Sequence, residues 1–135
     1  MNPHYALVAR RAGHRCEYCR APEAVFNFPF EVEHITPTVR GGAAHESNWA
    51  MSCRSCNVYK GDAVEGFDPQ TGRSVPLFHP RLQRWEAHFA LDEGTGQING
   101  LTATGRATVA RLQMNGAAQL SARREWARLR WFPIS

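Results

Sequence analysis

The sequence predicts one small α+β domain that is stabilised by a metal ion. Three observations favour this fold class. The chain has 135 residues, of which 43% are hydrophobic and 21% charged, a composition that suits one modest core. Its four cysteines form two Cys-x-x-Cys pairs. Between residues 24 and 61, hydrophobic and turn-forming residues follow the order strand, loop, strand, helix.

The first of these elements in chain order is a short helix. We expect it over residues 2–12, because Asn2 can cap its start and Gly13 can end it. Residues 14–19 then form a turn that presents the first cysteine pair. Tyr18, between the two cysteines, is expected to pack over the metal site.

An extended segment is expected over residues 24–35, as one strand or as two short strands interrupted at Pro29. Its hydrophobic side chains alternate on one face: Phe26, Phe28, Phe30 and Val32. Neighbouring residues of a strand point to opposite faces, so Glu33 and His34 can share a site only where the strand ends and the backbone turns. Pro37, just beyond, supports such an ending.

Residues 36–47 are expected to form a polar loop with a Gly-Gly pair, and Asn48 closes it. Residues 49–51 suit a second short strand. Ser52 can cap a helix that ends at Gly61. On this helix, four residues with metal-binding or charged side chains lie on adjoining faces: Cys53, Cys56, Asn57 and Lys60.

The remainder of the chain is expected to contain a loop, a β-hairpin and two helices. The loop covers residues 62–80, the hairpin joins residues 84–91 to 98–102, and the last helix covers residues 118–131. We expect residues 1–66 to form the core and residues 67–135 an extension that packs on it within the same domain. The last helix carries arginines that form either a solvated face or a DNA-backbone contact: Arg123, Arg124, Arg128 and Arg130.

The cysteine spacing is typical of a structural zinc site. Four thiolates on two tight turns can close a tetrahedral Zn²⁺ site and add folding energy to a small core: Cys16, Cys19, Cys53 and Cys56. Two disulfides or a redox Cys-x-x-Cys are the alternatives. A reducing cytoplasm disfavours the first, and the second requires only one pair.

Charge and hydrophobicity indicate the class of partner. The formal charge is +4, the isoelectric point is near 9.2, and Lys60 is the only lysine. A basic balance favours polyanions such as DNA, although arginine content also follows genomic base composition. No hydrophobic run approaches the roughly 18 residues of a membrane span, and the start lacks a signal-peptide core. We therefore expect a cytoplasmic protein.

The polar residues of the strand–loop–strand–helix segment match the requirements of phosphodiester hydrolysis, which needs a base, a divalent cation and charge neutralisation. His34 can be the base. Glu33 and Asn57 offer oxygen ligands that suit Mg²⁺ or Mn²⁺ better than zinc. Lys60, one turn beyond Asn57, is either a phosphate contact or a solvated residue at the end of the helix.

The motifs of residues 16–61 resemble those of the HNH nucleases, in the subgroup with a four-cysteine zinc site. The shared motifs, in the family's order, are C-x-Y-C, VEHI-x-P, GG, N and C-x-x-C-N-x-x-K-G. The resemblance implies a treble-clef-like ββα-metal fold and DNA cleavage that leaves 5′-phosphate and 3′-hydroxyl ends. It also implies roles for four residues: His34 as general base, Glu33 and Asn57 as ligands of the catalytic metal, and Asn48 as the residue that braces the loop and orients the histidine.

Asn57 departs from the pattern, because the family name implies histidine there; the change is expected to weaken the affinity for transition metals and to favour Mg²⁺, with Mn²⁺, Co²⁺ or Ni²⁺ as alternatives. Residues after Gly61 are similar to the tail of small stand-alone bacterial HNH proteins. We therefore expect a DNA endonuclease. A non-catalytic zinc module that binds nucleic acid or protein is the alternative, and RNA is a further substrate class. The sequence leaves the substrate-binding residues and the choice between monomer and homodimer open.

Overall fold

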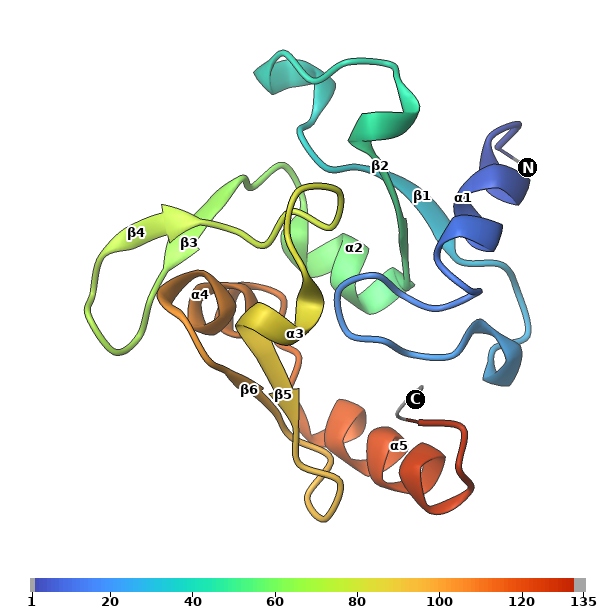
Figure 1. Cartoon of the computed structure of the whole chain (residues 1–135), viewed down its shortest axis with the longest axis vertical. Coiled ribbons are helices and arrows are strands. Elements are labelled where there is room, and N and C mark those ends of the chain that lie inside the picture. Colours follow the sequence, from blue (N-terminus) through green and yellow to red (C-terminus); the bar gives the residue numbers. More distant parts are fainter. Residues whose placement is uncertain (1, 133–135) are drawn as a thin grey trace.

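A strand–loop–strand–helix unit forms one side of the structure, a computed structural model that describes residues 2–132, and its helix lies near the middle (Figure 1). Strand β1 (Glu31–His34) pairs antiparallel with β2 (Trp49–Ser52). Helix α2 (Arg54–Lys60) follows directly, and Cys53 caps it by accepting a hydrogen bond from the Cys56 N–H. The predicted α+β fold with an HNH-like ββα core is confirmed.

The other elements precede or follow this unit in the chain. They are, in chain order, α1 (Tyr5–Arg11), β3 (Glu65–Phe67), β4 (Ser74–Pro76), α3 (Trp85–His88), β5 (Phe89–Leu91), β6 (Ile98–Gly100), α4 (Ala103–Arg111) and α5 (Ala117–Arg128). Within residues 2–132 the strands form three separate antiparallel sheets of two strands each: β1–β2, β3–β4 and β5–β6. In Figure 1, α2 lies between the β1–β2 ribbon and the C-terminal elements.

The extended segment is shorter than the sequence predicts. Glu23–Val25 forms a 3₁₀ turn, and only residues from Glu31 onward form a strand. Phe28 is 54% exposed, so the alternating phenylalanines do not line one buried face. Instead, Phe26 packs against Phe30 at 4.8 Å between ring centroids. The segment is interrupted at Pro29 as predicted, but the residues before it form no strand, because local aromatic packing replaces strand pairing.

Residues 62–80, predicted as a loop, contain the β3–β4 hairpin. Its strands have three residues each and include Gly66 and Pro76, so the sequence carries little strand signal. The turn is held by buried Asp68, whose carboxylate accepts two hydrogen bonds from Arg106 of α4, at 2.8 and 2.9 Å. A long-range ion pair therefore fixes a segment whose local sequence favours irregular structure.

The C-terminal hairpin and both helices are present, but the hairpin is shorter than predicted: residues 85–88 of its first arm form α3, and the strands cover only Phe89–Leu91 and Ile98–Gly100. Thr102 caps α4 by accepting a hydrogen bond from the Gly105 N–H at 3.0 Å. Helix α5 ends at Arg128, three residues before its predicted end. One prediction about its surface was wrong, because Arg123 is buried rather than solvated. The division of the chain after residue 66 stays a prediction, and that position falls inside β3.

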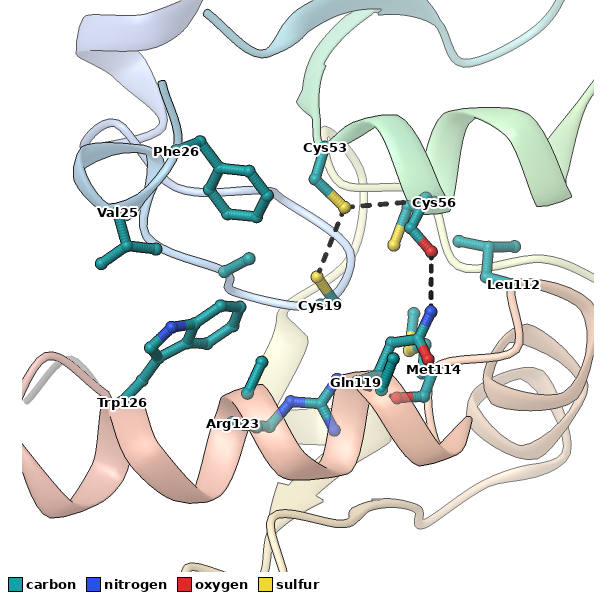
Figure 2. A pocket seen from close by; sticks show the side chains of 14 residues that line it. Cys19, Val25, Phe26, Cys53, Cys56, Leu112, Met114, Gln119, Arg123 and Trp126 are labelled. Atoms are coloured by element: carbon teal, nitrogen blue, oxygen red, sulfur yellow. Dashed lines mark hydrogen bonds between the residues drawn. The ribbon is translucent and has the colours of Figure 1, made fainter. Parts of the chain in front are cut away.

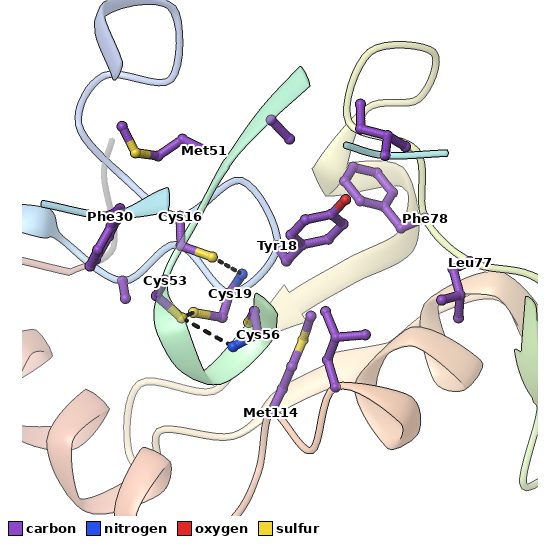
Figure 3. Packing of buried hydrophobic residues seen from close by; sticks show 14 of the residues in the cluster. Cys16, Tyr18, Cys19, Phe30, Met51, Cys53, Cys56, Leu77, Phe78 and Met114 are labelled. Carbon is purple, nitrogen blue, oxygen red and sulfur yellow. Dashed lines mark hydrogen bonds between the residues drawn. The ribbon is translucent and has the colours of Figure 1, made fainter. Parts of the chain in front are cut away.

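The cysteines are part of the hydrophobic core. Figure 3 shows them between Phe30 and Met51 on one side and Met114 on the other. Tyr18 has no exposed surface and packs edge-to-face on Phe78, as its predicted core position requires. Among residues 2–132, no helix has the length and hydrophobicity that a membrane crossing needs.

Candidate active site and metal centre

The four cysteines meet at one point in the core. Cys16 and Cys19 come from the turn after α1, Cys53 caps α2, and Cys56 lies in its first turn. Their sulfur atoms all lie within 4.8 Å of one another, and all four residues are buried. The predicted cluster is therefore confirmed.

Two backbone N–H groups donate hydrogen bonds to sulfur atoms of this cluster. In each pair the second N–H donates to the first sulfur, at 3.5 Å from Cys19 to Cys16 and at 3.4 Å from Cys56 to Cys53. Contact with the Cys16 thiol lowers the pKa of Cys19 and raises the pKa of Cys53, because the buried cluster cannot hold several negative charges unaided. A closed set of four sulfur ligands is compatible with structural zinc.

A second candidate site lies at the end of β1. A pocket of about 370 Å³ opens there, between the end of the strand, the following loop and α2. Its polar lining includes Glu33, His34 and Asn57, together with Asp62. The structure therefore brings the predicted base and both predicted metal ligands to one cavity.

Glu33 is held firmly inside this site. Its side chain is 2% exposed. One carboxylate oxygen accepts a hydrogen bond from the Tyr18 hydroxyl at 2.5 Å, and the other lies 2.6 Å from the Lys60 ammonium. Burial raises the pKa of Glu33, although Lys60 and Tyr18 oppose that shift. Two neighbours thus fix the direction of the carboxylate.

Lys60 does not occupy either of its predicted positions. It is 1% exposed, and its ammonium group also donates to the Ile35 carbonyl at 2.9 Å. It is therefore neither solvated nor free to contact phosphate. A lysine at the end of a short helix is usually exposed, but here Glu33 offers a buried partner and draws the ammonium inward.

Asn57 is oriented by a residue that the sequence did not single out. Its amide NH₂ donates to Glu31, which is also paired with Arg54 at 3.3 Å. With the NH₂ group turned toward Glu31, the amide oxygen of Asn57 is the atom left for a ligand.

Asn48 holds the loop between the two strands. Its side-chain oxygen accepts from the Thr36 N–H at 2.8 Å, and its NH₂ donates to the carbonyls of Thr36 and Ala43. Gly42 allows this closure, because a Cβ there would lie 1.7 Å from the Thr36 carbonyl oxygen. These contacts are those of a brace, as predicted for Asn48; its effect on the histidine stays a prediction.

His34 is the last residue of β1 and pairs across the ribbon with Trp49. It is partly exposed at the pocket, and within residues 2–132 its imidazole makes no hydrogen bond. The ring therefore remains available to a water molecule or substrate.

The segment that contains the cysteine cluster and the ββα unit matches a known protein family. Residues 16–63 match the model of the HNH endonuclease family. This segment, the HNH domain, holds a four-cysteine cluster that is consistent with the zinc-bearing subgroup of that family. Neither a search of curated proteins nor one of solved structures found a significant match.

The open pocket of the HNH domain has a donor set that fits a hard divalent cation. Glu33 supplies a carboxylate and Asn57 an amide oxygen, and these ligand types suit Mg²⁺ or Mn²⁺. Each oxygen of Glu33 accepts one hydrogen bond and keeps another lone pair. The Lys60 charge weakens the attraction of Glu33 for a further cation, so we expect binding to be weak without substrate phosphate.

Three residues of the HNH domain gain roles that sequence reasoning missed. Tyr18 and Glu31 orient Glu33 and Asn57, respectively, and Asp62 lines the pocket. One signal was present for Glu31, since it alternates with Glu33 along the strand. No local signal links Tyr18 to Glu33, because fifteen positions of chain separate them.

Proposed function

We propose that the chain is a metal-dependent endonuclease that hydrolyses DNA phosphodiester bonds. The observation that carries this proposal is the convergence of His34, Glu33 and Asn57 on one open pocket of the HNH domain. The family match supports a nuclease and a nucleic-acid substrate. The preference for DNA rests on the resemblance of the motifs and on the net charge of +4.

In this proposal, His34 is the general base. Its imidazole faces the pocket without a partner among residues 2–132, so it can take the proton of an attacking water. Asn48 fixes the backbone of the loop that follows His34 and thereby limits the positions open to the ring. Asn48 is thus a positioning residue.

Glu33 and Asn57 would hold the divalent cation, Mg²⁺ or Mn²⁺. When bound, such an ion supplies Lewis-acid stabilisation of negative charge on the phosphate. Lys60 and Tyr18 contribute by orienting Glu33 before the ion arrives, which lowers the cost of assembling the site. We assign Lys60 this positioning role in place of a phosphate contact.

A non-catalytic zinc module is the second candidate, and one observation favours it. The Glu33–Lys60 pair already neutralises the carboxylate that the cation requires. In a binding module this pair would be purely structural, and His34 would have no role in any reaction.

A plasmid-nicking assay separates these candidates. Wild type, His34→Ala and a control variant are compared in EDTA, Mg²⁺ and Mn²⁺. His14→Asn is a suitable control, because His14 lies outside the pocket and asparagine tolerates its positive φ of 56°. We expect nicking that requires Mg²⁺ or Mn²⁺, is retained in the control and is lost in His34→Ala. Equal nicking by His34→Ala would remove the base assignment, and DNA binding without cleavage would favour the binding module.

The remaining parts of the proposal concern organisation. We propose a core of residues 1–66 with an extension of residues 67–135, and a cytoplasmic location. One pocket can cut one strand at a time, so double-strand breaks require a homodimer or two successive encounters. Analytical ultracentrifugation with and without DNA distinguishes monomer from homodimer.

A further inference from the structure

Arg123 of α5 is a buried cation that has no carboxylate beside it among residues 2–132. The residue is 1% exposed. Its guanidinium donates to the Gly96 carbonyl at 2.6 Å and to the Met114 carbonyl at 2.8 Å. Within residues 2–132, no Asp or Glu forms an ion pair with it, and its buried Nε–H has no hydrogen-bond partner.

Such a charge requires compensation. Removing an arginine from water costs several kcal/mol unless an opposite charge lies nearby, and neutral carbonyls supply only part of that. The unused Nε–H adds a further cost, because a buried donor without an acceptor loses its hydrogen bonds to water. A source of negative charge near α5 would account for both features.

The cysteine cluster lies across a cavity from this arginine. A cavity of about 300 Å³ separates α5 from the two cysteine turns, and its lining includes Cys19, Cys53, Cys56 and Arg123. Figure 2 shows these cysteines on one side of the cavity and Arg123 on the other. Burial lowers the pKa of Arg123, and the cysteines oppose that shift.

The charge of a zinc-loaded cluster has the required sign. Four thiolates around one Zn²⁺ leave a net charge of about −2 at the centre. Such thiolates accept hydrogen bonds and are stabilised by cations around them. In the described part of the chain, every other side chain that lines the cavity is hydrophobic or neutral polar, so Arg123 is the one cation facing the cysteines.

We infer that Arg123 is the cation that balances the zinc–thiolate centre and that it fastens α5 to the HNH domain. The inference rests on zinc at the cysteines and is independent of nuclease activity. Residues 16–63 then supply the four zinc ligands, and helix α5 supplies the positive charge that balances them. Arg123 is then a positioning residue for the metal centre, while its two carbonyl contacts hold the guanidinium in place.

Cobalt substitution tests this inference, because Co²⁺ reports on the electronic state of its sulfur ligands. The variants are Arg123→Met and, as a matched control, Arg124→Met at the exposed neighbour on the same helix. Loss of the positive charge raises the energy of the sulfur electrons, so the sulfur-to-cobalt absorption of Arg123→Met should move to longer wavelength. The Arg124→Met spectrum should match wild type.

Zinc release to a chromogenic chelator gives a second readout. Loss of a residue that supports metal ligands weakens metal affinity by about 10- to 100-fold, so Arg123→Met should release zinc faster by a comparable factor. Arg124→Met should release it at the wild-type rate. If Arg123→Met melts at a lower temperature but keeps the wild-type absorption and release rate, the residue is only a structural contact and the inference fails.

Arg123→Lys decides the matter if the methionine variant does not fold. Lysine keeps the charge and most of the stem but loses the planar fork. We expect it to fold, to retain zinc, and to show a cobalt spectrum close to that of wild type. A lysine variant that folds but releases zinc faster than Arg124→Met, or that fails to fold, would overturn the role of charge.

Discussion

The HNH domain carries two candidate metal sites that differ in burial, in ligand type and in the way their ligands are held. The cysteine cluster is buried and closed, and all of its ligands are sulfur atoms from tight turns. The pocket at His34 is open, and its donors are a carboxylate and an amide held by neighbouring side chains. A closed sulfur site suits a structural ion, whereas an open oxygen site leaves room for substrate and water.

The two sites are connected through two side chains. Tyr18 lies between Cys16 and Cys19, and Lys60 lies on the helix that Cys53 caps. Both side chains contact Glu33. These contacts indicate that the sulfur site supports the open pocket. The cysteines hold the segments that carry Tyr18 and Lys60, and these two side chains orient the carboxylate of Glu33.

The largest expected effect follows from breaking the sulfur site. Cys53→Ser should destabilise the whole fold by several kcal/mol, because metal binding contributes directly to folding. Thermal unfolding and zinc content measure this. An unchanged melting temperature with zinc still bound would show that the cluster is not structural.

His34→Ala should affect only the open pocket. Removal of a general base costs about 10²- to 10⁴-fold in rate, so cleavage should fall by that factor or more. Zinc content and melting temperature should remain those of wild type, since the imidazole makes no hydrogen bond within residues 2–132. If His34→Ala also lost zinc, a change in the open pocket would affect the sulfur site, and the two sites would not be independent.

Lys60→Met probes the connection at the carboxylate. It leaves Glu33 charged and unpaired in a buried position, which typically costs about 3–5 kcal/mol. Chemical denaturation measures the loss. Arg54→Met is the matched control on the same helix: its pair with Glu31 is exposed, so about 1 kcal/mol or less is expected. Equal small losses for both variants would place the Lys60 ammonium in solvent.

Tyr18→Phe gives the smallest expected effect and the sharpest test of coupling. It removes one donor to Glu33 and nothing from the cysteines, so we expect a stability loss of about 1–3 kcal/mol. Zinc content should stay unchanged, while the Mg²⁺ or Mn²⁺ concentration that supports half-maximal nicking should rise. An unchanged metal requirement would mean that Glu33 needs no help from the zinc turn.

The sequence alone determined the four-cysteine cluster and the ββα unit. Local signals carried these predictions: paired Cys-x-x-Cys spacings, a strand that ends at Glu33-His34, and a helix that begins at the second cysteine pair. The same signals failed for β3 and β4, because strands of three residues with Gly66 and Pro76 show no periodicity. Their stability comes from contacts with α4, which are distant in the chain.

Only the tertiary structure decided the environments of the charged residues. Lys60 and Arg123 look solvated from their helical positions, yet both are buried beside groups that the chain brings from far away. Spacing predicts which neighbours a residue meets within one turn or strand, and it does not predict the long-range partners that set burial and charge. Residue types therefore indicated the candidate chemistry, and packing decided that Lys60 holds Glu33 and that Arg123 faces the cysteines.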